Sequence, residues 1–158
     1  MSTQAVIQSQ YHAALVMLRQ AVELCPDSLW ADASYINPTW HIAYHTLYYT
    51  TLYLQPTAED FDPQEHFRDD LRGLENSDPE LAYTKEEILD YLTLCQAQVD
   101  EQVSAVDLAG DSGFDWLPFN KLELQFYNIR HIQHHTGELC ERIGAQGGFD
   151  IKWVKMKG

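Results

Sequence analysis

Four long stretches of this chain carry apolar residues at the spacing of an amphipathic helix, and this pattern constrains the fold more than any other feature. In the first stretch, residues 2–25, the apolar positions recur every three or four residues: Ile7, Tyr11, Ala14, Leu18, Val22 and Cys25. The same periodicity marks residues 38–54, 85–108 and 121–144, and no convincing strand pattern precedes residue 149. The sequence therefore predicts an all-α fold, a four-helix bundle in which each helix buries one face.

Helix-starting signals stand before three of these stretches. Asn37 followed by Pro38 predicts an N-cap and a first helical residue for the second helix. Thr84 with Glu87 three positions later predicts a capping box for the third helix. Asn120 is placed to cap the fourth helix. A chain of 158 residues is long enough for one domain with a proper core and too short for two, so we expect a single domain over residues 1–158.

Residues 55–83 form a long, acidic, proline-containing segment between the second and third helices. Loops of this length are uncommon inside a compact domain and are often functional. The segment permits a crossover, so that the bundle need not be a simple up-and-down one, and we expect it to fold over one end of the bundle. It contains His66, a weak ligand candidate. At the other end of the chain, Gly147 and Gly148 begin a C-terminal arm, residues 147–158, which is expected as a strand or an irregular tail.

Composition excludes several classes of function. The 158 residues carry a formal net charge of −14, which argues against nucleic acid and against anionic membrane surfaces as partners. No apolar run is long enough to cross a bilayer, and the residues after Met1 do not resemble an export signal. The three cysteines, Cys25, Cys95 and Cys140, are far apart and odd in number, as is typical of buried thiols. We therefore expect a cytoplasmic protein.

Two of the helical stretches carry a pair of histidines four residues apart. His131 and His135 lie one turn apart on one face of the fourth helix, the spacing at which two imidazoles can hold one metal ion. At about 100° per residue, His135 falls about 40° from His131, at the edge of the apolar stripe, whereas His134 points away. In the second helix His45 falls inside the apolar stripe and His41 on its flank. Geometry therefore favours His45, His131 and His135 as ligands.

A single histidine on an apolar face is more often a hydrogen-bonded core residue than a ligand. The His131–His135 pair raises the case for a metal, because two inward imidazoles one turn apart resist being protonated together, which lowers their pKa values. Three neutral imidazoles suit a divalent ion such as zinc, nickel, iron or cobalt, and they leave a coordination position open for catalysis. If His41 joined them, four imidazoles would close the site.

The two histidine motifs resemble those of a known family. Asn-Pro-Thr-Trp-His-Ile-Ala-Tyr-His-Thr-Leu-Tyr-Tyr at residues 37–49 and Asn-Ile-Arg-His-Ile-Gln-His-His-Thr-Gly-Glu-Leu at residues 128–139 are similar to the motifs of the DinB-like metalloproteins, which are bacterial four-helix bundles. The resemblance covers nearly the whole chain. It implies the ligands His45, His131 and His135, zinc or nickel as the metal, a right-handed crossover and a homodimer. Some members of the family are transferases or isomerases that use a low-molecular-weight thiol.

The leading hypothesis is thus a metal-dependent enzyme, a transferase or hydrolase, that acts on a small molecule by activating a thiol or water. The alternative is a non-enzymatic, dimeric helical bundle that binds a metal or ligand without turnover. The position of His41 distinguishes the two, since an open site of three imidazoles favours catalysis and a closed site of four favours a structural ion.

Overall fold

The computed structural model describes residues 1–63, 68–75 and 78–156, and within these ranges the fold is all-α. Its four long helices are α1 (Thr3–Leu24), α3 (Thr39–Leu54), α4 (Lys85–Ala105) and α5 (Lys121–Gly147). A short helix α2 (Asp27–Trp30) and two 3₁₀ turns, η1 (Asp69–Leu71) and η2 (Pro79–Leu81), occupy the connections. His66 lies outside the described residues.

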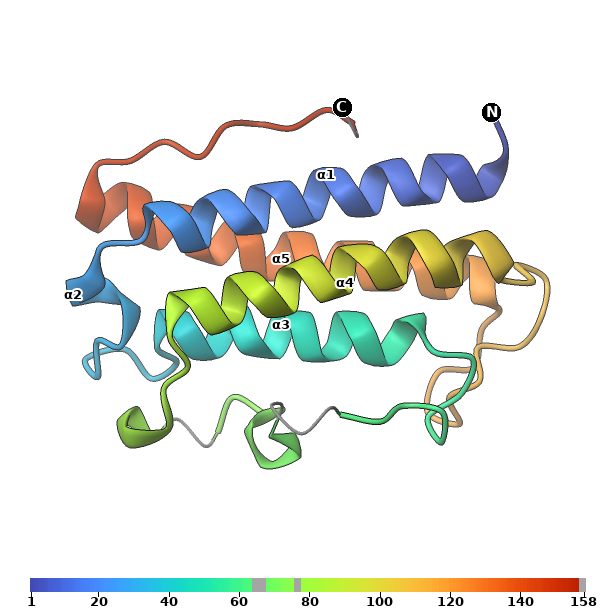
Figure 1. Cartoon of the computed structure of the whole chain (residues 1–158), viewed down its shortest axis with the longest axis horizontal. Helices are drawn as coiled ribbons and strands as arrows, with labels where there is room; N and C mark the ends of the chain where they lie inside the picture. Colours follow the sequence, from blue (N-terminus) through green and yellow to red (C-terminus); the bar gives the residue numbers. More distant parts are fainter. Residues whose placement is uncertain (64–67, 76–77, 157–158) are drawn as a thin grey trace.

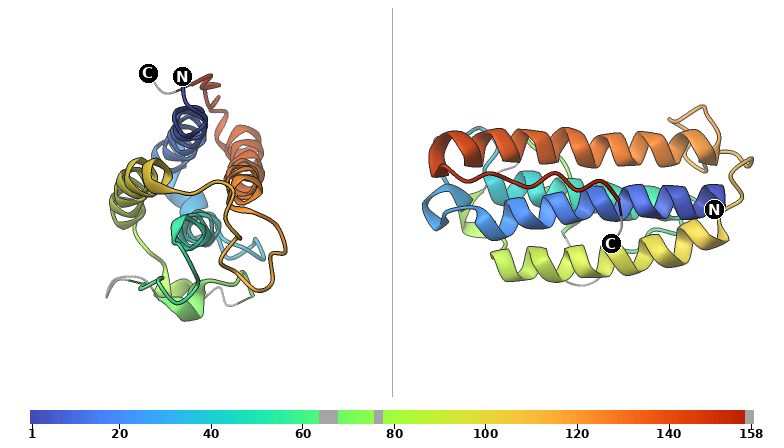
Figure 2. Two further views of the ribbon diagram at one scale, coloured as in Figure 1. Left: turned by 90° about the vertical axis from the view of Figure 1, so that its right-hand side faces the viewer. Right: turned by 90° about the horizontal axis from the view of Figure 1, so that it is seen from above.

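The four long helices lie side by side (Figure 1). Helix α1 packs against α4 and α5, and α3 packs against the same two helices, so that α1 and α3 stand at opposite corners in the end view (Figure 2). Helices α3 and α4 run in the same direction, which requires the connecting segment to travel back along the molecule (Figure 1).

That segment does not cover one end of the molecule, as the sequence led us to expect. Its described residues lie along the side of α3 instead. The carbonyl oxygen of Arg68 accepts a hydrogen bond from the Tyr44 hydroxyl at 2.7 Å, and that of Leu71 pairs with His41 at 2.8 Å. The reason is topological, because a chain that leaves the end of α3 must return along its whole length to begin a parallel α4.

Two of the three predicted caps are confirmed, and one is wrong. Thr84 and Glu87 form the capping box of α4, and the Asn120 side chain accepts a hydrogen bond from the Glu123 amide at 2.9 Å. Asn37, however, does not cap α3. Pro38 has a non-helical ψ of 156°, so the helix begins only at Thr39, and no side chain caps its first turn.

The connections and the tail differ from the sequence pattern in detail. Residues 27–30 form helix α2, which buries Trp30, and the Trp30 indole donates to the carbonyl oxygen of Tyr83 at 2.8 Å. Helix α5 continues three residues past Gly144, so Gly147 belongs to the helix and not to the arm; Gly148 follows as the C-cap, with a left-handed φ of 69°. The described part of the tail is irregular, and Lys152 is hydrogen-bonded through its backbone to Gln20 of α1.

Helix α3 is buried on almost every side and not on one face as predicted, because the segment after it covers the side that the other helices leave open. The largest fully buried side chains on it are Trp40, Tyr44 and Tyr48. Cys25, Cys95 and Cys140 are unpaired thiols. In the described part of the chain, none of the helices combines the length and the apolar character that crossing a lipid bilayer requires.

Candidate metal centre

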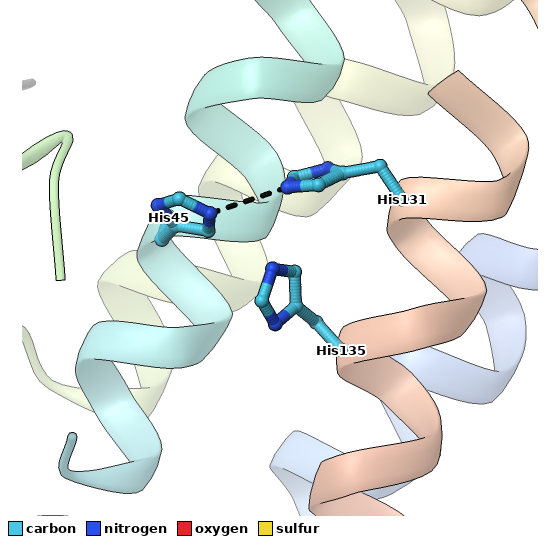
Figure 3. A group of neighbouring side chains, drawn as sticks. All are labelled: His45, His131 and His135. Atoms are coloured by element: carbon cyan, nitrogen blue, oxygen red, sulfur yellow. Dashed lines mark hydrogen bonds between the residues drawn. The ribbon is translucent and has the colours of Figure 1, made fainter. Parts of the chain in front are cut away.

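Three imidazoles converge where α3 faces α5. His45 comes from α3, and His131 and His135 come from successive turns of α5 (Figure 3). One ligand atom of each residue lies within 4.8 Å of the others. The ring centroids are 4.7–5.2 Å apart, and one ring nitrogen of His135 is turned towards the space between the other two rings (Figure 3). Among the described residues, these three form a group that could hold a metal ion.

The donor set fits such an ion. The Nε2 atoms of His45 and His131 are 3.2 Å apart. Two nitrogen ligands at bond lengths of about 2.0–2.1 Å and a tetrahedral angle stand roughly 3.3–3.4 Å apart, close to this separation. Two imidazole lone pairs cannot face each other at this distance unless a proton or a cation lies between them. A borderline divalent ion between the two rings would fit the 3.2 Å separation and would accept both lone pairs.

The tautomer of His45 is set by the chain that follows α3. Its Nδ1 lies 2.6 Å from the carbonyl oxygen of Arg72, an atom that can only accept, so Nδ1 carries the hydrogen. The lone pair is therefore on Nε2, the atom that faces His131. Metal-binding histidines in general are oriented by such a second contact, meaning the hydrogen bond of the ring nitrogen that does not bind the metal.

His135 and His131 differ in their second contacts. The Nδ1 of His135 lies 3.3 Å from a carboxylate oxygen of Glu138, which leaves its Nε2 lone pair available. The Nδ1 of His131 is buried without a hydrogen-bond partner. His131 is therefore held mainly by packing, against the rings of His45, Tyr49 and His135.

The pKa values of all three imidazoles are lowered, whereas the sequence led us to expect this only for His131 and His135, from their mutual repulsion. Burial is the main cause, and the neighbouring imidazoles add to it. The pKa of His131 falls from 6.5 to about 3 and that of His45 to about 4, and the pKa of His135 is also lowered, although Glu138 opposes that shift. All three rings are therefore neutral at pH 7, the form that binds a metal.

The remaining histidines in the described chain have other surroundings. His41 is fully buried, stacks on Trp40 with ring centroids 4.8 Å apart, and pairs through Nε2 with the carbonyl oxygen of Leu71. It is not a member of the group of three. His134 is exposed, and His12 pairs with Asp100 at 2.8 Å between α1 and α4. The helical phase at 100° per residue had placed His134 outside the site, and it had left open whether His41 is a fourth ligand.

A cleft of about 630 Å³ opens beside the three imidazoles. The Tyr49 ring separates the two, because it lines the cleft and also packs against His45 and His131 at 4.9 and 5.8 Å. Arg72, whose carbonyl oxygen orients His45, lines the same cleft. Half of the lining residues are aromatic: Tyr48, Tyr49, Tyr53, Phe61 and Trp116. None of the three imidazoles lines this cleft directly, and none lines a separate cavity of about 280 Å³ near Lys121; only the cleft is connected to them through Tyr49 and Arg72.

No family model, no curated protein and no solved structure matched the chain. The function must therefore be argued from the site itself.

Sequence reasoning found the three imidazoles and missed their second contacts. Glu138 follows His135 by three positions, a spacing that places the two side chains on one helix face, so this contact had a visible signal. The Arg72 contact had none, because it is made by a backbone carbonyl group from a separate segment.

Proposed function

We propose that this protein is a metal-dependent enzyme of the DinB-like type, a four-helix bundle that acts on a small molecule. The observation that carries the proposal is the convergence of three neutral imidazoles, from His45, His131 and His135, next to an aromatic-walled cleft. Three protein ligands leave at least one coordination position for water or substrate, which is the arrangement of catalytic rather than structural sites.

The residues around the centre have distinct roles in this proposal. When bound, zinc or nickel would polarise a substrate and lower the pKa of a water or thiol in the open position. The carbonyl oxygen of Arg72 holds His45 in the tautomer that binds. Tyr49 packs against two of the imidazoles and also lines the cleft, so a substrate in the cleft would contact its ring next to the centre.

The cleft favours a small molecule with an apolar or planar part. Five aromatic side chains line it, and such walls bind planar groups by stacking and by burial of apolar area. A low-molecular-weight thiol is the proposed co-substrate, on the basis of the family resemblance. The bonding of His41 to Leu71 supports an open site over the closed site of four imidazoles, and hence an enzyme over a protein that only binds.

The test is metal analysis followed by an activity assay. The purified protein should contain about one zinc or nickel ion per chain, and a His135→Ala variant should contain almost none. Loaded and chelator-treated protein are then assayed for consumption of low-molecular-weight thiols with electrophilic small molecules. Absence of bound metal in the wild-type protein would overturn the proposal. Metal without turnover on any thiol or hydrolytic substrate would favour the binding protein.

We further propose that the protein is a cytoplasmic homodimer. The support is the family resemblance, together with several large apolar side chains that lie exposed: Ile36, Trp116, Phe126 and Trp153. Sedimentation that detects only monomer at tens of micromolar chain would remove the dimer from the proposal.

A further inference from the structure

We propose that Glu138, held in place by Arg142, is a positioning residue for the metal ligand His135. This inference rests on the proposed metal function and adds to it two residues that bind no metal themselves. The structure points to an ordered series of contacts that begins at the start of α3, passes through Arg142 and Glu138, and ends on the imidazole of His135.

The first contact joins Glu138 to His135. The Oε2 atom of Glu138 lies 3.3 Å from the Nδ1 atom of His135, one turn earlier on α5. A carboxylate has no hydrogen to donate and can only accept, so the imidazole hydrogen is held on Nδ1 and the lone pair is on Nε2. The negative charge also makes the imidazole a stronger donor to a metal.

The second contact fixes Glu138. Its other oxygen, Oε1, forms an ion pair at 3.6 Å with the Nη2 atom of Arg142, four residues later on the same helix. The Glu138 side chain is 39% exposed, so on its own it could rotate into solvent or towards the imidazoles. If Glu138 rotated towards the imidazoles, its carboxylate would compete for the open coordination position of the metal.

Arg142 is itself immobilised by the start of α3. Only 7% of Arg142 is exposed. Its Nη1 atom donates to the carbonyl oxygen of Asn37 at 2.8 Å and approaches the Thr39 hydroxyl at 3.4 Å, and its guanidinium lies 4.0 Å from the Tyr35 ring centroid. A buried guanidinium with these partners cannot follow Glu138 elsewhere. The ion pair therefore keeps Glu138 beside Nδ1 and out of the open position.

These contacts also connect the two helices that supply the ligands. Asn37 and Thr39 stand at the start of α3, which carries His45, and Arg142 stands on α5, which carries His131 and His135. The same guanidinium thus contacts Glu138 on one side and the first residues of α3 on the other, so that Glu138 is held in place by both helices.

The experiment compares zinc affinity in Glu138→Ala, Glu138→Gln and Glu141→Ala by competition with a chromophoric chelator at pH 7.5. Glu141→Ala is a matched control, since Glu141 is exposed one turn later on the same helix and its substitution removes the same charge. We expect Glu138→Ala to weaken zinc binding about 10–100-fold, the usual effect of losing a second contact. Glu138→Gln should lose less, because its amide oxygen still accepts, and Glu141→Ala should stay within about twofold of wild type.

A double-mutant cycle tests the role of Arg142. Arg142→Lys should weaken zinc binding in the wild-type background and have little further effect after Glu138→Ala, since its influence passes through Glu138. Visible spectra of the cobalt-substituted proteins report the coordination number. Proton–nitrogen NMR of the metal-free proteins reports the His135 tautomer, which should be the Nδ1–H form in the wild type and Glu138→Gln and mixed in Glu138→Ala. A purely structural role would leave both signatures unchanged.

The outcomes separate the two proposals. If the wild type binds no zinc, both the metal function and this inference fall. If the wild type binds zinc and Glu138→Ala binds it as tightly as Glu141→Ala does, only this inference is overturned. Should Glu138→Ala fail to fold, Glu138→Gln, which keeps the shape of the side chain, and Arg142→Lys decide. If both variants bind zinc as tightly as the wild type and keep its cobalt spectrum, the positioning role of Glu138 is overturned.

Discussion

The Nδ1 atom of His45 donates a hydrogen bond to the carbonyl oxygen of Arg72 at 2.6 Å. This bond makes the segment after α3 a part of the candidate metal centre, because it selects the ring nitrogen that His45 presents to His131. Since a backbone carbonyl is the acceptor, the contact depends on the path of the segment and not on the identity of residue 72.

Removing any one of the three converging imidazoles should strip the metal. His45→Ala, His131→Ala and His135→Ala should each reduce bound zinc or nickel to a small fraction of one ion per chain, because two remaining imidazoles bind weakly. Elemental analysis after gel filtration measures this directly. His134→Ala and His12→Ala are the controls and should retain the ion, since His134 is exposed and His12 pairs with Asp100. Loss of metal in His134→Ala, with retention in His131→Ala, would show that the assigned ligand set is wrong.

Zinc affinity should change little between pH 8 and pH 6. The pKa of His131 lies near 3 and that of His45 near 4, and the pKa of His135 is also lowered, so protons compete weakly in this range. Three ordinary imidazoles with a pKa of about 6.5 would lose roughly 70-fold in affinity by pH 6, whereas here we expect a loss of less than about fivefold. Chelator competition across the pH series provides the measurement, and a steep loss above pH 6 would contradict the lowered pKa values.

The metal-free protein should lose stability as the pH falls from about 6.5 towards 4. In the unfolded chain the histidines take up protons near pH 6.5, but in the folded chain His131 and His45 remain neutral until about pH 3–4. The unfolded state therefore binds more protons in this window, and acid favours it by up to about 1.4 kcal/mol per pH unit for each such histidine. Urea melts with chelator at pH 7.5 and pH 5 test this. His131→Gln should show a smaller difference between the two, and an equal difference would refute the assignment.

Chelation should lower the melting temperature at pH 7.5 without abolishing helicity. Metal bound to the folded state adds stability by mass action, whereas the core of α1, α3, α4 and α5 is built from apolar side chains that need no ion. Circular dichroism during the melt distinguishes the two effects. A chain that loses its helices on chelation would have a structural metal site, contrary to the proposed open centre.

His41 should prove structural. Its ring stacks on Trp40 and pairs with the carbonyl oxygen of Leu71, so His41→Ala leaves a cavity and an unpaired buried acceptor. We expect the free energy of unfolding to fall by about 2–4 kcal/mol, with metal stoichiometry unchanged at a temperature where the variant is folded. Chemical denaturation and elemental analysis give the two numbers. Loss of the metal from folded His41→Ala would make His41 a fourth ligand.

Local chemistry made much of this protein predictable. Helical periodicity located the four long helices, and the capping residues Thr84 and Asn120 marked two starts correctly, because periodicity and capping depend on neighbours within one or two turns. The prediction for Asn37 was wrong because it considered only the neighbouring residues. The Asn-Pro pair is a common helix start, but here Pro38 has a non-helical ψ of 156° and α3 begins at Thr39, next to contacts with Arg142 from the far end of the chain.

The sequence by itself determined which imidazoles could meet, because a spacing of four residues and the phase of an apolar stripe place His131, His135 and His45 on inward faces. Only the tertiary structure decided that they do meet, that His41 is bonded to Leu71, and that Arg72 and Glu138 orient two of the rings. Helix phase is a property of a few neighbouring residues. The distance between two helices and the course of the segment after α3 depend on the packing of the whole chain.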